Sequence, residues 1–304
     1  MKLVAVGSIA LDTLETPFGR AEEALGGSAT YFSLAARLFS PVGLVGVVGG
    51  DFPGRHVDLL KAHGVDTAGL VAEQGRTFRW SGRYDFDLNV AHTLDTQLNV
   101  FAEFHPNLPA RYRQAEYLFL GNIHPALQLD VLGQVERPRF VALDTMNFWI
   151  EGERAALTRV IEKVDAVLIN EAEARQYAGT HNLLKAARDL MALGPRVVVI
   201  KKGEYGSVLF TRDCYFVAPG YPLEAVKDPT GAGDSFAGAF VGYLARAGDL
   251  EEATLRRAVV HGSAVASFTC EDFGVGRLER LDAAAVRERC AEFRRFTHFE
   301  HESE

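Results

Sequence analysis

The stretch Lys227–Ala239, "KDPTGAGDSFAGA", places two glycines and an acidic residue where an apolar helical pattern begins. Asp228 precedes a proline, which predicts a turn because proline restricts the residue before it to extended angles. After Gly231, apolar side chains recur at helical spacing, and Gly248 predicts the end of the helix. The glycines therefore stand in the first turn of a predicted helix.

That first turn has the properties of an anion site. Gly231, Ala232 and Gly233 present backbone N–H groups without partners in the helix, and the helix dipole adds about half a positive charge. Asp234 stands beside these amides, and the dipole favours its ionised form. A general base that deprotonates a hydroxyl attacking a phosphoryl group has these requirements. A simple helix cap is the alternative interpretation of the same residues.

Two commoner nucleotide motifs are absent from the sequence. The chain contains no GxxxxGK[ST], and Phe236 occupies the third glycine position of GxGxxG. The residues before the glycines, "VKDPT", predict no strand. These observations argue against an NAD-dependent oxidoreductase, which an alternating α/β pattern alone would allow.

Short apolar runs alternate with amphipathic runs along the chain. The predicted strands are Leu3–Gly7, Gly43–Gly49, Glu116–Gly121, Arg139–Asp144, Ala166–Asn170 and Arg196–Lys201, and the predicted helices include Ser28–Phe39, Arg55–His63 and Asn182–Leu193. Continuously apolar strands separated by helices predict an α/β fold, with a parallel sheet covered on both faces. Ligands of such sheets bind at the carboxyl ends of the strands.

The segment Arg76–Phe104 lacks this alternation of strand and helix patterns. It alternates polar and apolar residues, which predicts antiparallel strands with one wet face. Together with residues 11–25 it predicts a small sheet inserted into a single domain that spans residues 1–304. We expect this sheet to be a lid over a ligand, a homodimer surface, or both. An edge extension of the main sheet is the alternative.

Composition narrows the classes of protein. The formal net charge is −8, so no nucleic-acid surface is expected, and no run approaches the roughly 20 apolar residues of a membrane helix. Three widely separated cysteines predict neither a disulfide framework nor a zinc site, and they fit a reducing, cytoplasmic location. The tail His298–Glu304 is expected to be a frayed acidic end.

"DPTGAGDSFAGAFV" resembles the C-terminal signature of the ribokinase-like (PfkB-type) carbohydrate kinase family. Three further motifs resemble the family in order along the chain: "GGSATYFSLAARLFSPVGLVGVVGGDFPG" (26–54), "NEAE" (170–173) and "KKGEYG" (201–206). The resemblance implies a ribokinase-like three-layer α/β/α fold with a mostly parallel central sheet and a small β-sheet lid. It also implies ATP and Mg²⁺, with a monovalent cation left open as a further cofactor.

For the phosphate side, the resemblance implies a role for each matching residue. Asp234 would be the catalytic base, and Gly231–Gly233 would form the hole for the γ-phosphate. Asn170 and Glu173 would organise Mg²⁺ through water, although a helix-capping pair explains the same two residues. The ATP side would be lined by Lys201, Gly203 and Gly206, where a plain glycine turn is the alternative, and Cys270–Gly276 is a candidate adenine loop.

For the acceptor side, the resemblance implies that Asp12 binds sugar hydroxyls, with a surface turn acid as the alternative. Gly26 and Gly27 would let the backbone approach the acceptor, and Ser28 would add a hydroxyl contact. Most relatives have asparagine where this chain has Tyr31, so the identity of the acceptor stays open.

Aromatic residues in the predicted lid bear on the same question. Their side chains either stack on a nucleobase or pack within the small sheet, and the sequence leaves both roles open for Phe78, Trp80, Tyr84 and Phe86. Asp144 and Asn147 follow a strand at the place where family members approach the phosphate-transfer path.

The sequence therefore predicts an ATP- and Mg²⁺-dependent phosphotransferase acting on a primary hydroxyl of a sugar. A nucleoside kinase on the same fold is the first alternative, and a catalytically idle sensor of sugar or nucleotide is the second.

Overall fold

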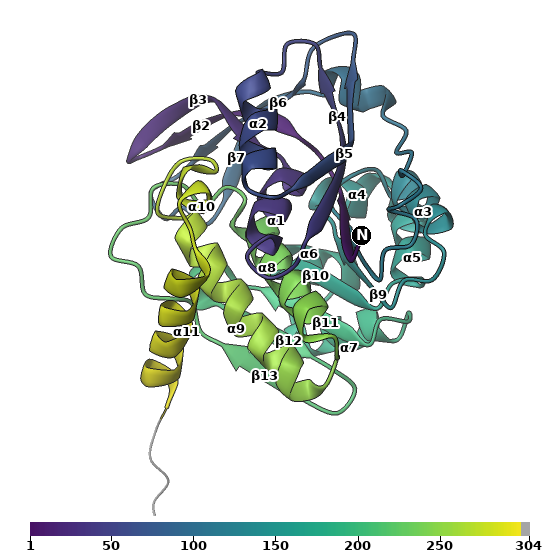
Figure 1. Ribbon diagram of the computed structural model, residues 1–304. Coiled ribbons are helices and arrows are strands. Elements are labelled where there is room, and N and C mark those ends of the chain that lie inside the picture. The colour runs from purple at the N-terminus through teal and green to yellow at the C-terminus, as the bar shows by residue number, and fades with distance from the viewer. Residues whose placement is uncertain (299–304) are drawn as a thin grey trace, which may run out of the picture.

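The computed structural model describes residues 1–298, so the predicted frayed tail lies, except for His298, outside the described residues. Its main sheet has nine strands in the order β13-β12-β11-β10-β9-β8-β1-β4-β5 (Figure 1). Their bounds are β1 Leu3–Val6, β4 Val42–Gly49, β5 Asp66–Glu73, β8 Tyr117–Leu120, β9 Phe140–Asp144, β10 Ala166–Asn170, β11 Val197–Lys201, β12 Ser207–Phe210 and β13 Tyr215–Ala218.

Strands β5, β4, β1, β8, β9, β10 and β11 are parallel, whereas β12 and β13 are antiparallel. Helices cover both faces because alternate strand residues enter two cores: Leu3 and Ala5 face one, Val4 and Val6 the other. The first face carries α1 Ser28–Ala36, α2 Gly54–Ala62, α8 Ala232–Ala247, α9 Glu252–Thr269, α10 Gly276–Glu279 and α11 Ala283–Thr297. The other carries α3 Pro125–Gln134, α4 Asn147–Gly152, α5 Arg154–Ile161, α6 Glu171–Ala178 and α7 Leu183–Met191.

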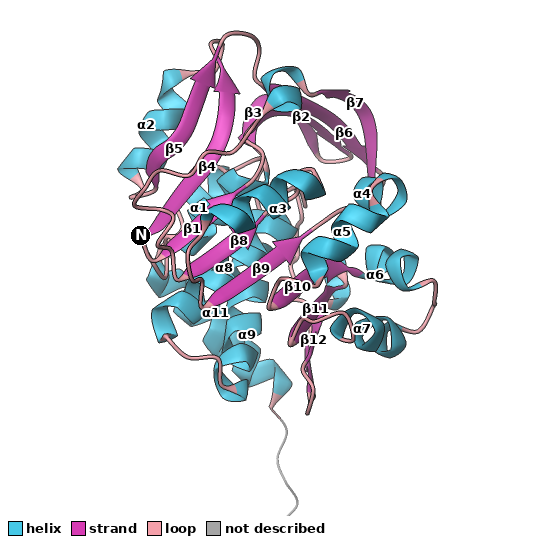
Figure 2. Ribbon diagram, turned by 90° about the vertical axis from the view of Figure 1, so that its right-hand side faces the viewer, coloured by secondary structure: helices cyan, strands magenta, loops and turns pink. Residues whose placement is uncertain are grey.

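A second, small sheet has the order β3-β2-β6-β7. Its strands are β2 Ala10–Thr16, β3 Gly19–Gly26, β6 Phe78–Tyr84 and β7 Ala91–Gln97. It is a separate sheet, so an edge extension of the main sheet is wrong. Figure 2 shows it at the end of the main sheet toward which β8 and β9 point.

The prediction of antiparallel strands holds within the small sheet's two hairpins but not between them. β2 pairs antiparallel with β3 and β6 with β7, whereas β2 and β6 are parallel. The two hairpins come from distant segments, and the chain between them passes through α1, β4, α2 and β5. No tight turn therefore fixes their relative direction.

The predicted elements of the main layers are confirmed. The strand Ala166–Asn170 has the predicted bounds, and the helix after the glycines runs Ala232–Ala247. Gly231 caps that helix with φ +75°, and Gly248 ends it with φ +74°. None of the helices within residues 1–298 is both long and apolar enough to cross a membrane.

Candidate active site

The N-terminus of α8 lies against the ring of Tyr31. A Cβ atom at Gly231 would stand 2.4 Å from Cγ, Cδ1 and Cδ2 of that ring. Tyr31, on α1, is only 1% exposed, and its hydroxyl is buried without a hydrogen-bond partner. Gly231 is therefore required twice, by its left-handed backbone and by this close approach. The structure places Tyr31 beneath the glycine turn.

Asp234 follows in the first turn of α8, beside an ion pair. Lys201 Nζ donates to Asp144 Oδ2 at 2.7 Å, and a Cβ at Gly233 would lie 3.2 Å from the same ammonium. Burial, together with the charge of Asp144, raises the pKa of Asp234 to about 7, and Lys201 acts in the opposite direction. The predicted base, the glycine turn and Lys201 thus come together.

Asn170 and Glu173 form a complete capping box at the start of α6. Asn170 Oδ1 accepts from the Glu173 N–H at 2.8 Å, and Glu173 Oε2 accepts from the Asn170 N–H at 3.0 Å. The alternative interpretation of Asn170 and Glu173 as a helix-capping pair is therefore confirmed. Burial, then the charge of Asp144, raise the pKa of Glu173 to about 7, with Lys201 opposing. The pair consequently adjoins the cluster around Asp234.

Within residues 1–298 no three acidic or histidine side chains are close enough to hold a metal ion directly, so only a hydrated Mg²⁺, bound through water, fits this arrangement. Asp144, Glu173 and Asp234 are three carboxyl groups around one ammonium, Lys201. The capping bond takes Oε2 of Glu173, so a metal-bound water would have to donate to Oε1. Mg²⁺ keeps several waters and is usually held by one or two carboxylates together with phosphates.

Asp12 reaches the same region from the small sheet. It is 4% exposed, and a Cβ at Gly26 would lie 1.9 Å from its Oδ2. Burial, together with the charges of Asp228 and Asp234, raises the pKa of Asp12 to about 8, and a hydrogen bond from the Gly27 backbone opposes the rise. Gly26, Gly27 and Asp12 therefore lie together, with Asp234 close enough to influence the titration.

Ser28 is engaged by the main sheet. Its Oγ accepts from the Ser8 N–H at 3.1 Å, and the Ser28 N–H donates to Ser8 Oγ at 3.1 Å. Ser28 is 6% exposed. Its hydroxyl joins the end of β1 to the start of α1, a structural role that the sequence did not show.

Asp228, which the sequence marked only as a turn residue, is fully buried. Its Oδ1 accepts from the Thr230 N–H at 2.9 Å and its Oδ2 from the Gly274 N–H at 3.2 Å. Burial raises the pKa of Asp228, and these hydrogen bonds oppose the rise. The carboxyl group thereby ties the glycine turn to the predicted adenine loop, Cys270–Gly276.

The small sheet makes two bonds to the segment that begins α8. Thr230 Oγ1 donates to the Tyr84 hydroxyl at 3.1 Å, and Thr16 Oγ1 donates to the Lys227 carbonyl at 2.9 Å. Of the other aromatic residues in the predicted lid, Phe78 packs on Phe101, Trp80 Nε1 donates to Thr93 Oγ1, and Phe86, in the loop between β6 and β7, is 81% exposed. Tyr84 is the member of that set bonded to the site.

Gly203 and Gly206 form the turn between β11 and β12, with φ +57° and +86°. A Cβ at Gly206 would lie 2.1 Å from the Ala218 carbonyl oxygen, so the turn accounts for this glycine. The loop between β6 and β7 contacts this turn. Asn89 Nδ2 from the loop donates to Oε1 of Glu204, which lies in the turn, at 3.2 Å.

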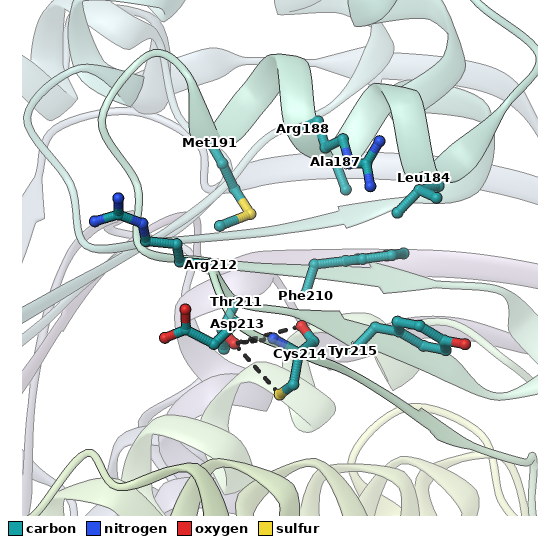
Figure 3. A pocket seen from close by; sticks show the side chains of 10 residues that line it. All are labelled: Leu184, Ala187, Arg188, Met191, Phe210, Thr211, Arg212, Asp213, Cys214 and Tyr215. Atoms are coloured by element: carbon teal, nitrogen blue, oxygen red, sulfur yellow. Dashed lines mark hydrogen bonds between the residues drawn. The ribbon is translucent and has the colours of Figure 1, made fainter.

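Two surface cavities lie away from the Asp234 cluster. One, of about 310 Å³, lies between α7 and the β12–β13 turn at Thr211–Cys214 (Figure 3). Because β12 runs antiparallel to β11, that turn lies at the opposite end of the sheet from Lys201. The other, of about 410 Å³, has walls from β3, α2 and Phe273–Gly276, and so includes part of the predicted adenine loop.

Comparison with known proteins shows the family of the chain. The model of the pfkB family carbohydrate kinases matches residues 12–280. The chain is 32% identical over 258 residues to the cytidine kinase of Thermococcus kodakarensis, an alignment covering 83% of this chain and 91% of that protein.

Two solved structures share the fold. The Burkholderia thailandensis nucleoside kinase in complex with inosine has a TM-score of 0.77 at 19% identity, covering 96% of this chain and 98% of that one. An E. coli protein described as a ribokinase II, with ATP and Mg²⁺, has a TM-score of 0.78 at 18% identity, covering 96% and 99%.

The chain belongs to the pfkB family of carbohydrate kinases. The resemblance drawn from four motifs and the ribokinase-like fold are both confirmed. The chain is an ATP-dependent kinase whose acceptor is a hydroxyl group of a carbohydrate or a nucleoside.

Proposed function

We propose that this kinase phosphorylates the primary hydroxyl of a nucleoside. The observation that carries the chemistry is the cluster in which Asp234, at the N-terminus of α8, adjoins both the Lys201–Asp144 pair and Asp12. The nucleoside, rather than the free sugar favoured by the sequence, is supported by the similarity to a cytidine kinase. The inosine complex with the same fold is compatible with this choice.

In the proposed reaction, the acceptor oxygen forms a bond to the γ-phosphorus of ATP as the bond between that phosphorus and ADP breaks. The hydroxyl proton passes to the Asp234 carboxylate. The N–H groups of Gly231–Gly233 and the helix dipole stabilise the charge on the phosphoryl oxygens. Asp12 accepts hydrogen bonds from ribose hydroxyls, and Gly26, whose Cβ would lie 1.9 Å from Asp12 Oδ2, leaves room for this carboxyl group.

On the nucleotide side, Lys201 places one cation beside the turn, and Gly203 and Gly206 form the adjoining wall of the ATP site. Asn170 and Glu173 would hold a hydrated Mg²⁺, which offsets phosphate charge when bound. Closure of the small sheet through Tyr84 and Thr230 excludes water from the phosphoryl group.

The test is ADP release from Mg²⁺–ATP with cytidine, inosine and ribose as acceptors. Asp234→Asn should lower kcat by roughly 10²–10⁴ while ATP binding survives. The exposed Asp58→Asn on α2 is the matched control and should retain full activity. Because Asp234 must be ionised to accept the proton and its pKa is about 7, wild-type kcat/KM should fall below about pH 7.

Ribose is the second candidate acceptor, because the Asp12 carboxyl group would bind sugar hydroxyls whether or not the sugar carries a base, and the family acts on carbohydrates. Turnover of ribose without turnover of either nucleoside would establish it and refute the nucleoside proposal. Tight binding of the acceptors without ADP release would indicate a sensor instead.

We further propose that the small sheet forms a homodimer surface. Every residue of its edge strand β7 is exposed, and Leu94 on that strand is 55% exposed, as is the neighbouring Val90. An exposed edge strand with apolar side chains favours pairing with another copy. Light scattering after size-exclusion chromatography should give a dimer mass for the wild type and a monomer mass for Leu94→Glu; a monomeric wild type contradicts the proposal.

A further inference from the structure

An aromatic cluster at the carboxyl ends of β8 and β9 has no part in the reaction described above. We define it as His124, Phe148 and Trp149. The rings of Phe148 and Trp149 have centroids 4.8 Å apart at 79°, and those of His124 and Trp149 are 5.0 Å apart at 65°. Both contacts are edge-to-face, the arrangement favoured by aromatic quadrupoles.

A hydrogen bond fixes the direction of Trp149. Its Nε1 donates to Asn122 Oδ1 at 2.8 Å, and Asn122 Nδ2 donates to Met146 Sδ at 3.0 Å. Trp149 follows β9, but this bond holds its indole toward the end of β8. In the main sheet β8 lies next to β1, and the chain continues from β1 to Asp12 on β2, so Trp149 is bonded just after the strand beside the one that leads to the acceptor residues.

The ends of β8 and β9 are joined to residues already placed in the site. Gln128 Nε2 donates to the carbonyls of Gly121, after β8, at 2.9 Å and of Asp144, which ends β9, at 3.3 Å. A Cβ at Gly121 would lie 3.0 Å from Ser28 Oγ, so this end of β8 adjoins the start of α1. Figure 2 shows α4, which carries Phe148 and Trp149, at the same end of the main sheet as the small sheet.

The outermost member of the cluster is open to a ligand. Phe148 is 60% exposed, although its edge is supported by the indole of Trp149. This ring leaves most of its area free at the carboxyl ends of the parallel strands, four residues after Asp144, which ends β9. A free aromatic face binds a planar heteroaromatic ring by stacking.

We propose that Phe148 is a specificity-determining residue that stacks on the base of the acceptor nucleoside, and that Trp149 and Asn122 are positioning residues that hold it. This inference rests on the proposed nucleoside kinase function and adds the side chains that would distinguish a nucleoside from a free sugar. Phosphoryl transfer itself does not depend on the cluster.

The test compares kcat/KM for cytidine and for ribose in the wild type and in Phe148→Ala. Loss of one stacking partner should raise KM for cytidine roughly ten-fold, leave kcat close to its wild-type value, and leave ribose turnover within about two-fold. Phe148→Tyr keeps an aromatic face and should behave like the wild type. Phe296→Ala, which removes a 44% exposed ring from α11, is the matched control and should change neither substrate.

Fluorescence gives a readout of the positioning residues. The chain has two tryptophans, so Trp80→Phe leaves Trp149 as the reporter. Cytidine should quench or shift its emission and ribose should not, and adding Asn122→Ala should reduce the response to cytidine.

Each outcome is decisive. Turnover of cytidine with an equal KM in Phe148→Ala and the wild type overturns this inference and leaves the nucleoside kinase proposal intact. Turnover of ribose but of no nucleoside by the wild type overturns both. A parallel loss of cytidine and ribose turnover in Phe148→Ala also overturns the inference, because it would show a general structural role.

Discussion

Replacement of Gly231 by alanine tests whether the glycine turn at α8 is held by the ring beneath it. The new methyl group would enter a backbone at φ +75° and would stand 2.4 Å from three ring carbons of Tyr31. That ring is 1% exposed within the core, so it has no free volume into which it can move. Either the turn or α1 must shift.

The two contributions can be estimated separately. A left-handed backbone costs a residue with a Cβ about 1–2 kcal/mol, and overpacking of a core typically costs about 1–3 kcal/mol. Their sum is about 2–5 kcal/mol. With an unfolding entropy of about 2.1 cal/mol/K per residue, this should lower Tm by about 3–8 °C. Displaced N–H donors should also reduce kcat by about 10²–10³.

Gly248→Ala provides the matched control. Gly248 ends the same helix with φ +74°, but a Cβ there would meet nothing within 4 Å. This variant should therefore show the backbone cost of about 1–2 kcal/mol alone, without a change in kcat. The difference between the two variants isolates the clash with Tyr31.

The assays are thermal unfolding and ADP release for Gly231→Ala, Tyr31→Leu and the double variant. Tyr31→Leu makes room above α1, so the double variant should be more stable than the sum of the single effects, with a coupling of about 1–3 kcal/mol. Strictly additive losses, or a Gly231→Ala variant no less stable than Gly248→Ala, would refute the reasoning.

Two further predictions concern charge. Burial raises the pKa of Asp12 from 3.8 to about 8, so between these values the folded chain keeps a proton that the unfolded chain releases, and stability falls as pH rises. Asp12→Asn lacks this loss, so its Tm relative to the wild type should rise from pH 5 to pH 8; parallel profiles by differential scanning fluorimetry would contradict this. Lys201→Met leaves the Asp144 carboxylate, 8% exposed, without its ammonium partner and should cost about 3–5 kcal/mol. It should also move the acidic limb of the kcat/KM profile to higher pH, because Lys201 lowers the pKa of Asp234; an unmoved limb would be evidence against their coupling.

The layers of the main fold were predictable because their signals are local. A strand buried on both faces must be apolar along its length, as β4 is at all eight positions, and such runs stand out between amphipathic helices. The helix α8 was equally evident, since both its ends are marked by glycines in left-handed conformation. The parallel pairing of β2 with β6 left no such signal, because it joins two hairpins between which the chain passes through α1, β4, α2 and β5.

The contacts that complete the site were not predictable for the same reason. Lys201 and Asp144 are 57 residues apart, and Thr230 and Tyr84 are 146 apart, so no spacing rule links either pair. Asp228 was recognisable as a turn residue, but its burial depends on Gly274, which comes from a distant loop. Tyr31 was interpreted from its difference from relatives, whereas its packing against Gly231 became visible only in three dimensions.

These contacts explain why the most flexible residue type stands where a phosphate site needs rigidity. The glycine turn is bounded by the Tyr31 ring, by the Lys201 ammonium near Gly233, and by the Asp228 carboxylate bonded to the Thr230 N–H. Each of these groups is itself buried or nearly so, and each is held by another element of the fold. Glycine therefore supplies close approach and a left-handed backbone, while its neighbours remove its freedom of motion. N–H donors fixed before the substrate arrives require no reorganisation during the reaction, and this is the condition under which they lower a barrier most.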